Sequence, residues 1–447
     1  MTILREQVLS VIDRRNHYEM AEDYYDGNVP EVFASRALRK AFWDSGSQGQ
    51  LNFCRPVVDA VNNRLYISAI QGTNDASTAA IDEIWRNNQL GLEANDIHRK
   101  SLTYGDGYAM VWPDENGDVE ISFNSPLTTS IVYDPESPRK KLYAVKMWEV
   151  SDGTRMNVYW PDRIEKYHVA NKSATEGSNW NLIDTVDNPF GRVPVFHFRT
   201  QRPFGRPEHF DAYDGQDYIN KQFVTSMLVT DYQGASQRWA LTRPDTEGAG
   251  IDNFEDGDTD RENADGLQAG PGQVWFMDNI EKVGEFKAAD PSVFWEPIKD
   301  TVRSLASITN TPLHYFEKTG NVPSGEALRV AEAPLIKKVQ DREASFGQTW
   351  REIFTFALEI MGIIDDVQVH WKAIESLDYL ERLDADLKKR NVGLSLAQVM
   401  REAGYDEKVI ERVIEEAALE RTNGDVAGYE RQVRVETQND ERSVEEQ

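Results

Sequence analysis

The segment that begins at Gly320 has the glycine spacing of a phosphate-binding loop. It reads GNVPSGEA, with its second glycine at Gly325. A nucleotide-binding P-loop needs a lysine and then a serine or threonine directly after that glycine, because the lysine holds the phosphates and the hydroxyl holds magnesium. Glu326 and Ala327 occupy these two places, and a carboxylate would repel a triphosphate. The sequence therefore argues against nucleotide binding here.

A second candidate site is the acidic stretch DGDTDRENADG, which starts at Asp256. Asp256, Asp258 and Asp260 stand at alternate positions, as the first ligands of a calcium-binding loop would. The sixth place of such a loop needs glycine but holds Arg261, and the twelfth needs glutamate but holds Leu267. A solvated acidic loop is therefore favoured. A metal-dependent hydrolase that uses this cluster stays open as the less favoured alternative.

The remaining reactive residues form no recognisable catalytic pattern. The seven histidines are scattered, and the chain contains no HExxH, GxSxG or CxxC motif. Cys54 is the single cysteine, so no internal disulfide can form, which fits assembly in a reducing cytoplasm. We therefore expect a protein that is not an enzyme and that has no metal and no cofactor.

Charge and hydropathy narrow the class of protein further. The 447 residues carry a net charge of -27, from 49 basic and 76 acidic side chains. The mean hydropathy is -0.60 and no apolar run approaches the roughly 18 residues of a membrane helix, so no membrane association is expected. Proteins that bind duplex DNA tightly have the opposite charge balance. Solubility is the plain explanation of this charge, and a surface that DNA passes without adhering is the sharper one.

The periodicity of the chain predicts an α+β fold. Apolar residues recur at helical spacing through most of the first hundred residues, and Gly105 ends this helical pattern. From Tyr108 to about Phe198 the period changes to two, in short aromatic and β-branched stretches. Asn116-Gly117 and Asp152-Gly153 are good hairpin signals between these stretches. An antiparallel sheet region is therefore expected after the helices.

Two long helices are expected to flank an acidic, glycine-rich excursion. Residues 211–238 would form the first helix and residues 291–309 the second, although Pro297 is expected to distort the start of the second helix or to move it later. Residues 243–288 lie between them and include a predicted strand pair, around GQVWFM and KVGEFKA. An antiparallel helix pair with a small domain at its tip is the simplest arrangement.

The last third of the chain is predicted to be mainly helical. Ser324 is the expected N-cap of a long helix, and Glu326 is favourable near its positive end. Pro334 lies about three turns into that helix, where it removes a backbone hydrogen bond and presses on the carbonyl of Val330, at a cost of roughly 3 kcal/mol. A kink is therefore predicted at Pro334. A short strand, VQVHWKA, and charged amphipathic helices follow, and the acidic residues 436–447 are predicted to be disordered.

Several stretches, in this order, resemble the portal proteins of tailed bacteriophages, and in particular the large siphophage-type portal family. They are YYDGN, FCRPVVDAVNNRL, NPFGRVPVFHF, GRPEHFDAYDGQDYINKQFVTSMLVTDYQGASQRW and TPLHYFEKTGNVPSGEALRVAEAPLIKKV. Together they cover roughly residues 20–360, and their order and length carry the resemblance more than any single motif.

The resemblance implies a portal fold with named parts. These are a helical and β-rich wing (1–210), a two-helix stem (211–240 and 290–309), a small α/β clip (241–289), a tunnel loop (310–323), a kinked tunnel helix that returns to the wing (324–372) and a short helical crown (373–435). The resemblance also implies a dodecameric ring at one capsid vertex, through which double-stranded DNA enters and leaves without sequence specificity.

The implied partners are the terminase large subunit, head–tail adaptor proteins, and the major capsid and scaffolding proteins. The protein would belong to the virion and would be assembled in the host bacterial cytoplasm. Another ring-forming virion connector component, such as a head–tail adaptor, is the main alternative, although adaptors are typically much shorter.

The resemblance also suggests which residues face the channel. The tunnel-loop candidates are Phe316, Lys318, Asn321, Ser324 and Glu326. Lys221 and Arg238 are candidates on the first stem helix, where sparse cations could make weak, exchangeable contacts with DNA. Each of these cations could equally face solvent or a neighbouring subunit.

Overall fold

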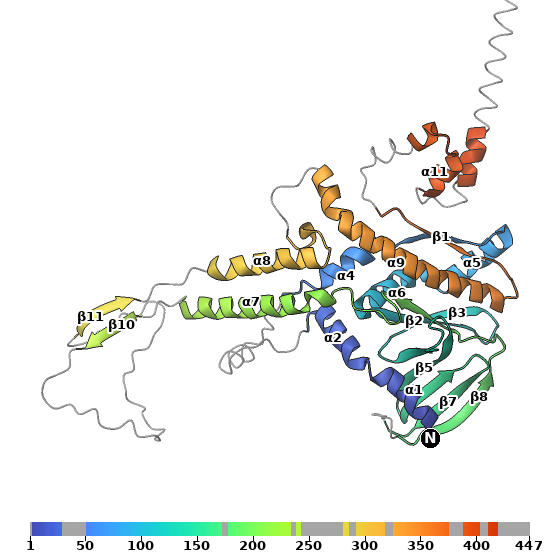
Figure 1. Ribbon diagram of the computed structural model, residues 1–447, viewed down its shortest axis with the longest axis horizontal. Coiled ribbons are helices and arrows are strands. Elements are labelled where there is room, and N and C mark those ends of the chain that lie inside the picture. Colours follow the sequence, from blue (N-terminus) through green and yellow to red (C-terminus); the bar gives the residue numbers. More distant parts are fainter. Residues whose placement is uncertain are drawn as a thin grey trace, which may run out of the picture.

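The computed structural model describes residues 2–28, 51–171, 178–233, 238–242, 280–285, 292–317, 325–374, 388–402 and 410–418. Within these ranges the protein has a body of helices and antiparallel strands, and a helical arm that extends away from it (Figure 1). The mixture of helices and antiparallel sheets confirms the predicted α+β class. None of the described helices is both long and apolar enough to span a membrane.

The N-terminal part of the body is helical, as predicted. Its helices are α1 (Thr2–Ile12), α2 (Arg15–Asp26), α4 (Arg55–Asn62), α5 (Asp75–Asn87) and α6 (Leu90–Tyr104). The last helical stretch before Gly105 forms two helices, α5 and α6. Gln89 lies between them with a positive φ of 51°, which is outside the range of an α-helix. Gly105 ends α6 in the left-handed conformation that glycine adopts most readily, with φ 84°. This end was predicted from the sequence and is confirmed.

Two antiparallel sheets follow in the body. The strands are β2 (Asp106–Pro113), β3 (Val119–Asn124), β4 (Thr129–Tyr133), β5 (Lys141–Val150), β6 (Gly153–Tyr159), β7 (Arg163–Val169), β8 (Asn181–Asp187) and β9 (Val195–Arg199). The smaller sheet has the order β3-β2-β9, and the larger has the order β4-β5-β6-β7-β8. The predicted hairpins are confirmed, since Gly117 lies between β2 and β3 and Gly153 begins β6 after β5.

Two strands of the body were not predicted. β8 is an edge strand whose side chains are almost all exposed, so it lacks the alternation that marks a half-buried strand. β1 (Ile67–Gln71) pairs with β12 (Gln368–Trp371), about three hundred residues further along the chain. Only β12 was expected as a strand. The short ISAIQ sequence of β1 sits between helices and is stabilised by a distant partner, which local periodicity does not report.

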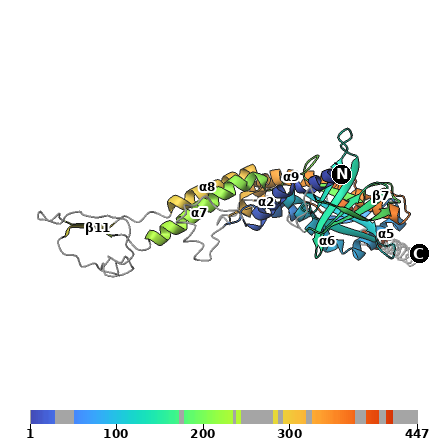
Figure 2. The ribbon, with the colours of Figure 1, turned by 90° about the horizontal axis from the view of Figure 1, so that it is seen from below.

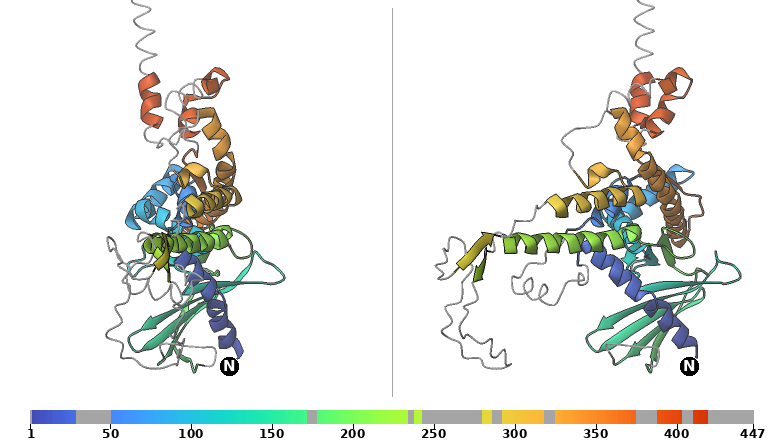
Figure 3. Two further views of the ribbon diagram at one scale, coloured as in Figure 1. Left: turned by 90° about the vertical axis from the view of Figure 1, so that its left-hand side faces the viewer. Right: turned by 60° about the vertical axis from the view of Figure 1, so that its left-hand side comes forward.

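The arm consists of α7 (Tyr213–Gln233) and α8 (Ser292–Ile308), which lie side by side (Figures 1 and 2). The 3-10 turn η1 (Phe210–Ala212) leads into α7, and η2 (Leu313–Tyr315) follows α8. At the end of the arm, β10 (Arg238–Thr242) pairs antiparallel with β11 (Ile280–Glu285) (Figure 3). Pro297 lies inside α8 and does not delay the start of that helix, which is at Ser292.

The prediction that residues 211–238 form one helix is wrong at its C-terminal end. α7 ends at Gln233, directly before Gly234, and glycine is common just past the end of a helix. Arg238 instead opens β10, and RWALT suits a strand because it contains an aromatic and a β-branched residue. The KVGEFKA stretch overlaps β11 as predicted, but the partner of β11 is β10, whereas GQVWFM lies outside the described residues.

The long helix α9 (Gly325–Ile360) crosses the body and builds its largest core. Leu335, Val339, Phe346, Trp350 and Phe354 are completely buried against α4, α5, α6, β2 and β9. A separate core forms where α1 packs on β4 and β5 of the larger sheet. Burial of these large side chains, at roughly 1.5–3 kcal/mol each, holds α9 against both the N-terminal helices and the smaller sheet.

The C-terminal described part is helical in each of its pieces. It contains α11 (Leu396–Glu402) and further helical residues at 388–391 and 410–418. The segment 436–447, predicted to be disordered, lies outside the described residues.

Candidate functional site

The described residues contain no cluster that could hold a metal ion. Among them, no three histidine, cysteine, aspartate or glutamate side chains gather closely enough to hold a metal ion. Cys54 is buried, and burial raises the pKa of its thiol well above the usual range, so the thiol stays protonated. Asp256, Asp258 and Asp260, on which the hydrolase alternative depends, lie outside the described residues. The most prominent feature is the arm and the contacts at its root, which is the end where α7 and α8 meet the body.

Apolar side chains join the two helices of the arm near the body. Ile219 of α7 and Ile298, Val302 and Leu305 of α8 are almost completely buried in one cluster. Gly215 lies opposite Leu305, and a β-carbon at Gly215 would stand 2.6 Å from Leu305 Cδ2. The helices therefore approach closely at this point because position 215 has no side chain.

Side-chain amides of α7 tie the arm to the segment that precedes α4. The buried Gln216 accepts a hydrogen bond from Phe53 N at 2.7 Å and donates one to the Leu51 carbonyl. Asn220, one helical turn further along, accepts from Leu51 N at 3.2 Å. These amides satisfy backbone groups that would otherwise be buried without partners, which costs about 1–3 kcal/mol per group. These hydrogen bonds therefore fix the position of α7 against the segment that precedes α4.

Aromatic contacts strengthen the same root. The rings of Tyr24 in α2 and Tyr213 at the start of α7 stack 3.9 Å apart with an interplanar angle of 6°. The Tyr24 hydroxyl donates to the carboxylate of Asp217 at 3.0 Å. Phe316, just after η2, packs against this cluster, with its ring centroid 6.3 Å from that of Phe53.

A buried ion cluster joins the root of the arm to α9. The Glu208 side chain is 2% exposed and lies 2.8 Å from both Lys338 Nζ and Arg342 Nε. Lys338 also donates to the Thr309 carbonyl, just past α8, and Arg342 donates to the Thr200 carbonyl, each at 2.9 Å. Burial alone would raise the pKa of Glu208, but the charges of Lys338 and Arg342 outweigh it and hold that pKa below its ordinary value. The cluster thus clamps the segment before α7, the end of α8 and the middle of α9.

Arg64 makes a second connection, between the segment before residues 318–324 and the helix after them. Its guanidinium donates to the Tyr315 hydroxyl in η2 and lies 3.0 Å from Glu332 Oε1 in α9. His314 Nε2 lies 3.6 Å from the same carboxylate oxygen. A single cation therefore holds the residues just before this segment and the first turns of the helix after it.

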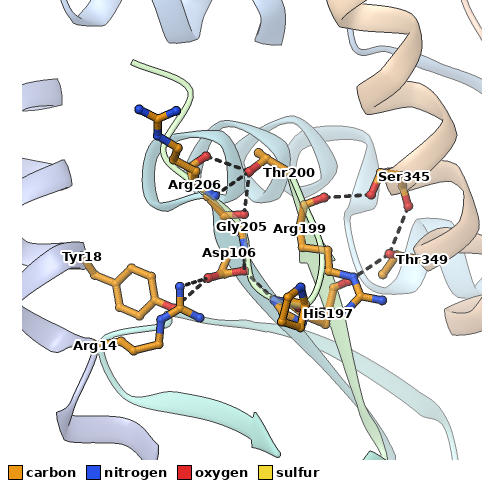
Figure 4. Close-up of polar contacts among 12 residues, drawn as sticks. Arg14, Tyr18, Asp106, His197, Arg199, Thr200, Gly205, Arg206, Ser345 and Thr349 are labelled. Atoms are coloured by element: carbon orange, nitrogen blue, oxygen red, sulfur yellow. Dashed lines mark hydrogen bonds and ion pairs between the residues drawn. The ribbon is translucent and has the colours of Figure 1, made fainter. Parts of the chain in front are cut away.

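A third polar centre lies around Asp106, at the start of β2 (Figure 4). Its carboxylate is completely buried and accepts hydrogen bonds from Tyr18 Oη and His197 Nε2 at 2.8 Å and from Gly205 N at 2.6 Å. Burial raises the pKa of Asp106, but the hydrogen bonds from His197 and Gly205 and the charge of Arg14 lower it below its ordinary value. The ionised Asp106 orders the segment that leads to Glu208 and the arm.

Comparison with known proteins decides the family. A family model described as phage portal protein, SPP1 Gp6-like, matches residues 11–269 and 278–413 of this chain. The chain belongs to the phage portal protein family. It is similar to the portal protein of Mycobacterium phage L5, with 29% identity over 410 residues that cover 86% of this chain and 81% of the relative. It is also similar to the portal protein of Mycobacterium phage D29, with 30% identity over 120 residues that cover 25% of each chain.

Solved structures of gene transfer agent (GTA) particles are also similar to the chain. A chain in the neck of an empty GTA particle has 13% identity and a TM-score of 0.45, and the match covers 84% of this chain and 95% of that one. A chain in the virion of a native GTA particle has 12% identity and a TM-score of 0.44, and the match covers 88% and 99%.

The structure places only part of the predicted channel residues of this portal protein. Lys318, Asn321 and Ser324 lie outside the described residues. Phe316 is half-buried at the root of the arm, and Glu326 is exposed in the first turn of α9. Their exposure to a channel therefore stays a prediction.

Two of the remaining predicted residues lie in helices and one does not. Lys221 is exposed on α7. Arg238 is not on a stem helix, because it belongs to β10. Pro334 lies within α9 and is exposed, and α9 changes direction near its N-terminal end (Figure 1). The attribution of that bend to Pro334 stays a prediction.

Sequence reasoning missed the charged residues that hold the portal chain together. Glu208, Lys338, Arg342, Arg64 and Asp106 are ordinary charged residues in a chain that has 125 of them, from 49 basic and 76 acidic side chains. Lys338 and Arg342 stand four residues apart on a predicted helix, so they share one face. The shared face of these two cations could be recognised in the sequence. Their partner Glu208 could not, because it lies 134 residues before Arg342.

Proposed function

We propose that copies of this portal protein form a dodecameric ring at one capsid vertex, and that DNA is packaged and ejected through the channel of the ring. Besides family membership, the observation that carries this proposal is the α7–α8 arm, which extends from the body and is clamped at its root. Helices held in this way can stand side by side around a tube. A closed ring of copies of the 51.0 kDa chain would surround such a tube.

The parts of the fold take the following proposed roles. Residues 1–210 form the wing, α7 and α8 form the stem, and residues 241–289 with β10 form the clip. Residues 310–323 form the tunnel loop, residues 324–372 include the kinked tunnel helix α9, and residues 373–435 form the crown. In this arrangement Arg64 holds both ends of the loop nearest the DNA, through Tyr315 and Glu332.

The proposed partners are those that the resemblance to portal proteins implies. The clip would bind the terminase large subunit during packaging and head–tail adaptor proteins afterwards. The wing and the crown would contact the major capsid and scaffolding proteins, with assembly in the host bacterial cytoplasm. The proposed place of the mature ring is the portal vertex of the virion.

The charge of the chain suits a channel that DNA passes through. A net charge of -27 repels phosphates, whereas a basic lining would retain DNA by counterion release. Lys221 on α7 and Lys318 are the proposed weak contacts. Replacement of Lys318 by alanine is expected to reduce DNA packaging and retention, while unchanged packaging and retention would refute the Lys318 contact alone.

Negative-stain microscopy of the purified full-length chain tests the ring. Annular particles with a central hole are expected, and their mass should correspond to about twelve copies. The Leu305→Asp variant is a useful comparison. A charge in the apolar α7–α8 cluster should loosen the arm and lower the number of annular particles. Monomers or featureless dimers of the unmodified chain, under conditions where it is folded, would contradict the proposal.

A further inference from the structure

A second feature of the body is a basic cavity that none of the proposed portal roles uses. Its volume is about 360 Å³, and it lies between the β4–β5 connection, the end of β9 and the middle of α9. Its charged lining consists of Arg139, Lys141, Arg199, Arg202 and Glu352, and its aromatic lining of Tyr133 and His197. Four cations thus face a single carboxylate, in a chain whose net charge is -27.

Three of these cations have no carboxylate partner. In the described part of the chain, neither Arg139 nor Arg202 makes an ion pair or a side-chain hydrogen bond. The Arg199 guanidinium donates to the Pro203 carbonyl at 2.9 Å and lies 5.3 Å from the centre of the Tyr133 ring. These three arginines therefore bring positive charge to one place that no carboxylate of the described residues pairs with.

Lys141 lies deeper in the same cavity and has a 19% exposed side chain. Its ammonium donates to the Val195 carbonyl at 2.9 Å, lies 4.4 Å from the centre of the Phe196 ring, and is 3.9 Å from Glu352 Oε2. Burial lowers the pKa of Lys141 to about 8; Glu352 raises it, and the charges of Arg199 and Arg192 lower it. The site therefore carries an excess of positive charge that a bound anion would relieve.

The walls of this basic cavity are held firmly in place (Figure 4). Ser345 donates to the Arg199 carbonyl at 2.8 Å, and Thr349 donates to the His197 carbonyl at 3.1 Å, so α9 fixes the end of β9. The Tyr133 hydroxyl lies 2.9 Å from His197 Nδ1, and the other ring nitrogen of His197 donates to the buried Asp106. A site whose walls are already ordered loses less entropy when a ligand binds.

We propose that this basic cavity binds an oxyanion, either the carboxylate of an acidic protein segment or a free anion of the sulfate type. Guanidinium groups match the planar oxygens of such anions in bidentate geometry, and charge-assisted hydrogen bonds are the strongest of their kind. A cavity of about 360 Å³ admits one such group but not a DNA duplex. The site is separate from the proposed channel contacts of α7 and the tunnel loop.

Isothermal titration calorimetry of the full-length chain at low ionic strength tests this site, with sodium sulfate and a hexaglutamate peptide as separate probes. We expect saturable binding of at least one probe. Binding of sulfate alone identifies a free-anion site, and binding of the peptide in competition with sulfate identifies a carboxylate segment as the occupant. The binding should weaken at least ~10-fold in the Arg139→Gln/Arg202→Gln variant, which removes two charge-assisted donors.

The matched control is Arg390→Gln/Arg412→Gln, which removes two exposed arginines from the C-terminal helices and changes the net charge equally. It should bind the probes as the unmodified chain does. If neither probe binds the unmodified chain, or if both double variants change the affinity equally, the cavity is an ordinary solvated surface and the proposal is overturned.

The pH dependence of sulfate binding gives an independent test, because sulfate keeps its charge near neutral pH. Affinity should fall as the pH rises through about 8, where Lys141 loses its proton. Of the other titratable groups in the cavity, burial raises the pKa of Tyr133 to about 12, and burial lowers the pKa of His197, so both are neutral there. Affinity that does not change between about pH 7 and 9 would exclude Lys141 from the site.

Discussion

Glu208 shows how a single buried carboxylate can hold several elements of this portal protein. It pairs with Lys338 and Arg342 at 2.8 Å each, and these cations bond the carbonyls of Thr309, just past α8, and of Thr200, just past β9. The variant Glu208→Gln should lower the free energy of unfolding by about 3–5 kcal/mol, since it leaves two cations partly buried without their counterion. Urea denaturation at neutral pH measures the difference.

The control for this prediction is Glu296→Gln in α8. Glu296 also pairs with a lysine, Lys299 at 3.3 Å, but its side chain is 63% exposed, and exposed pairs contribute about 0–1 kcal/mol. Equal effects of the two variants would contradict the role assigned to Glu208.

His98 predicts how the stability of the body depends on pH. The ring is completely buried; its Nδ1 lies 3.2 Å from the Leu65 carbonyl, and its Nε2 accepts from Trp350 Nε1 at 2.8 Å. Burial lowers the pKa of His98 to about 4, so the folded state resists the proton that the unfolded chain binds below about 6.5. Stability should therefore fall by roughly 3 kcal/mol as the pH decreases from about 6.5 to 4.

Urea midpoints at pH values across this window test the prediction, with His98→Gln as the comparison. Glutamine can still donate and accept but does not titrate, so the variant should lose less stability on acidification. His209, whose pKa burial also lowers to about 4, keeps its own share of the decline in both proteins. An identical decline in both proteins would exclude His98 as a cause.

Among the helices, the pair α7 and α8 depends on the missing side chain of Gly215. A β-carbon there would lie 2.6 Å from Leu305 Cδ2, and Leu305 is 2% exposed and has little room to move. The variant Gly215→Ala should destabilise the arm by about 1–3 kcal/mol, although alanine favours helix by roughly 1 kcal/mol. Thermal unfolding and limited proteolysis of the arm measure the effect.

Gly91→Ala in α6 is the matched control. The nearest atom to a β-carbon at that position is Trp85 Nε1 at 3.8 Å, an ordinary contact distance. This variant should be neutral or slightly stabilising. If Gly215→Ala behaved in the same way, the close approach of the helices would not depend on glycine.

Pro334 is the predicted cause of the bend in α9. Its side chain is exposed, so Pro334→Ala removes little packing and restores a backbone N–H for the Val330 carbonyl. The variant chain should be more stable by up to ~3 kcal/mol, yet rings should form or package DNA less well, because a straighter helix would move the loop that precedes it.

Lys337→Ala, an exposed change three residues further along the same helix, is the control and should affect neither property. Normal rings and normal packaging with Pro334→Ala would show that the bend is incidental.

For the assembled molecule, the net charge of -27 predicts weak binding to duplex DNA. Purified rings should bind a short duplex more weakly than about 10⁻⁴ M at physiological salt, since few cations are available to release counterions. Fluorescence anisotropy with a labelled duplex measures this, and a basic non-specific DNA-binding protein serves as the positive control. Micromolar binding with a steep salt dependence would contradict the non-adhesive channel.

Element types were predictable wherever a local period existed. Strands β2 to β7 and β9 alternate apolar and polar residues or carry good turn signals, and the long helices keep an apolar stripe. β8 and β1 were missed, because one is an exposed edge strand and the other needs a partner some three hundred residues away. Arg238 was misplaced because the helical pattern continues past Gly234 in the sequence, whereas Arg238 begins strand β10 in the structure.

Local patterns were thus sufficient for the α+β class, the acidic character and the resemblance to portal proteins. Only the tertiary structure shows which charged side chains are buried. Glu208 and Arg342 meet across 134 residues, and the cations of the basic cavity come from β4–β5, β9 and the segment after it. Burial and pairing depend on contacts between distant segments, and a charged residue has the same appearance in a sequence whether it will be solvated or enclosed.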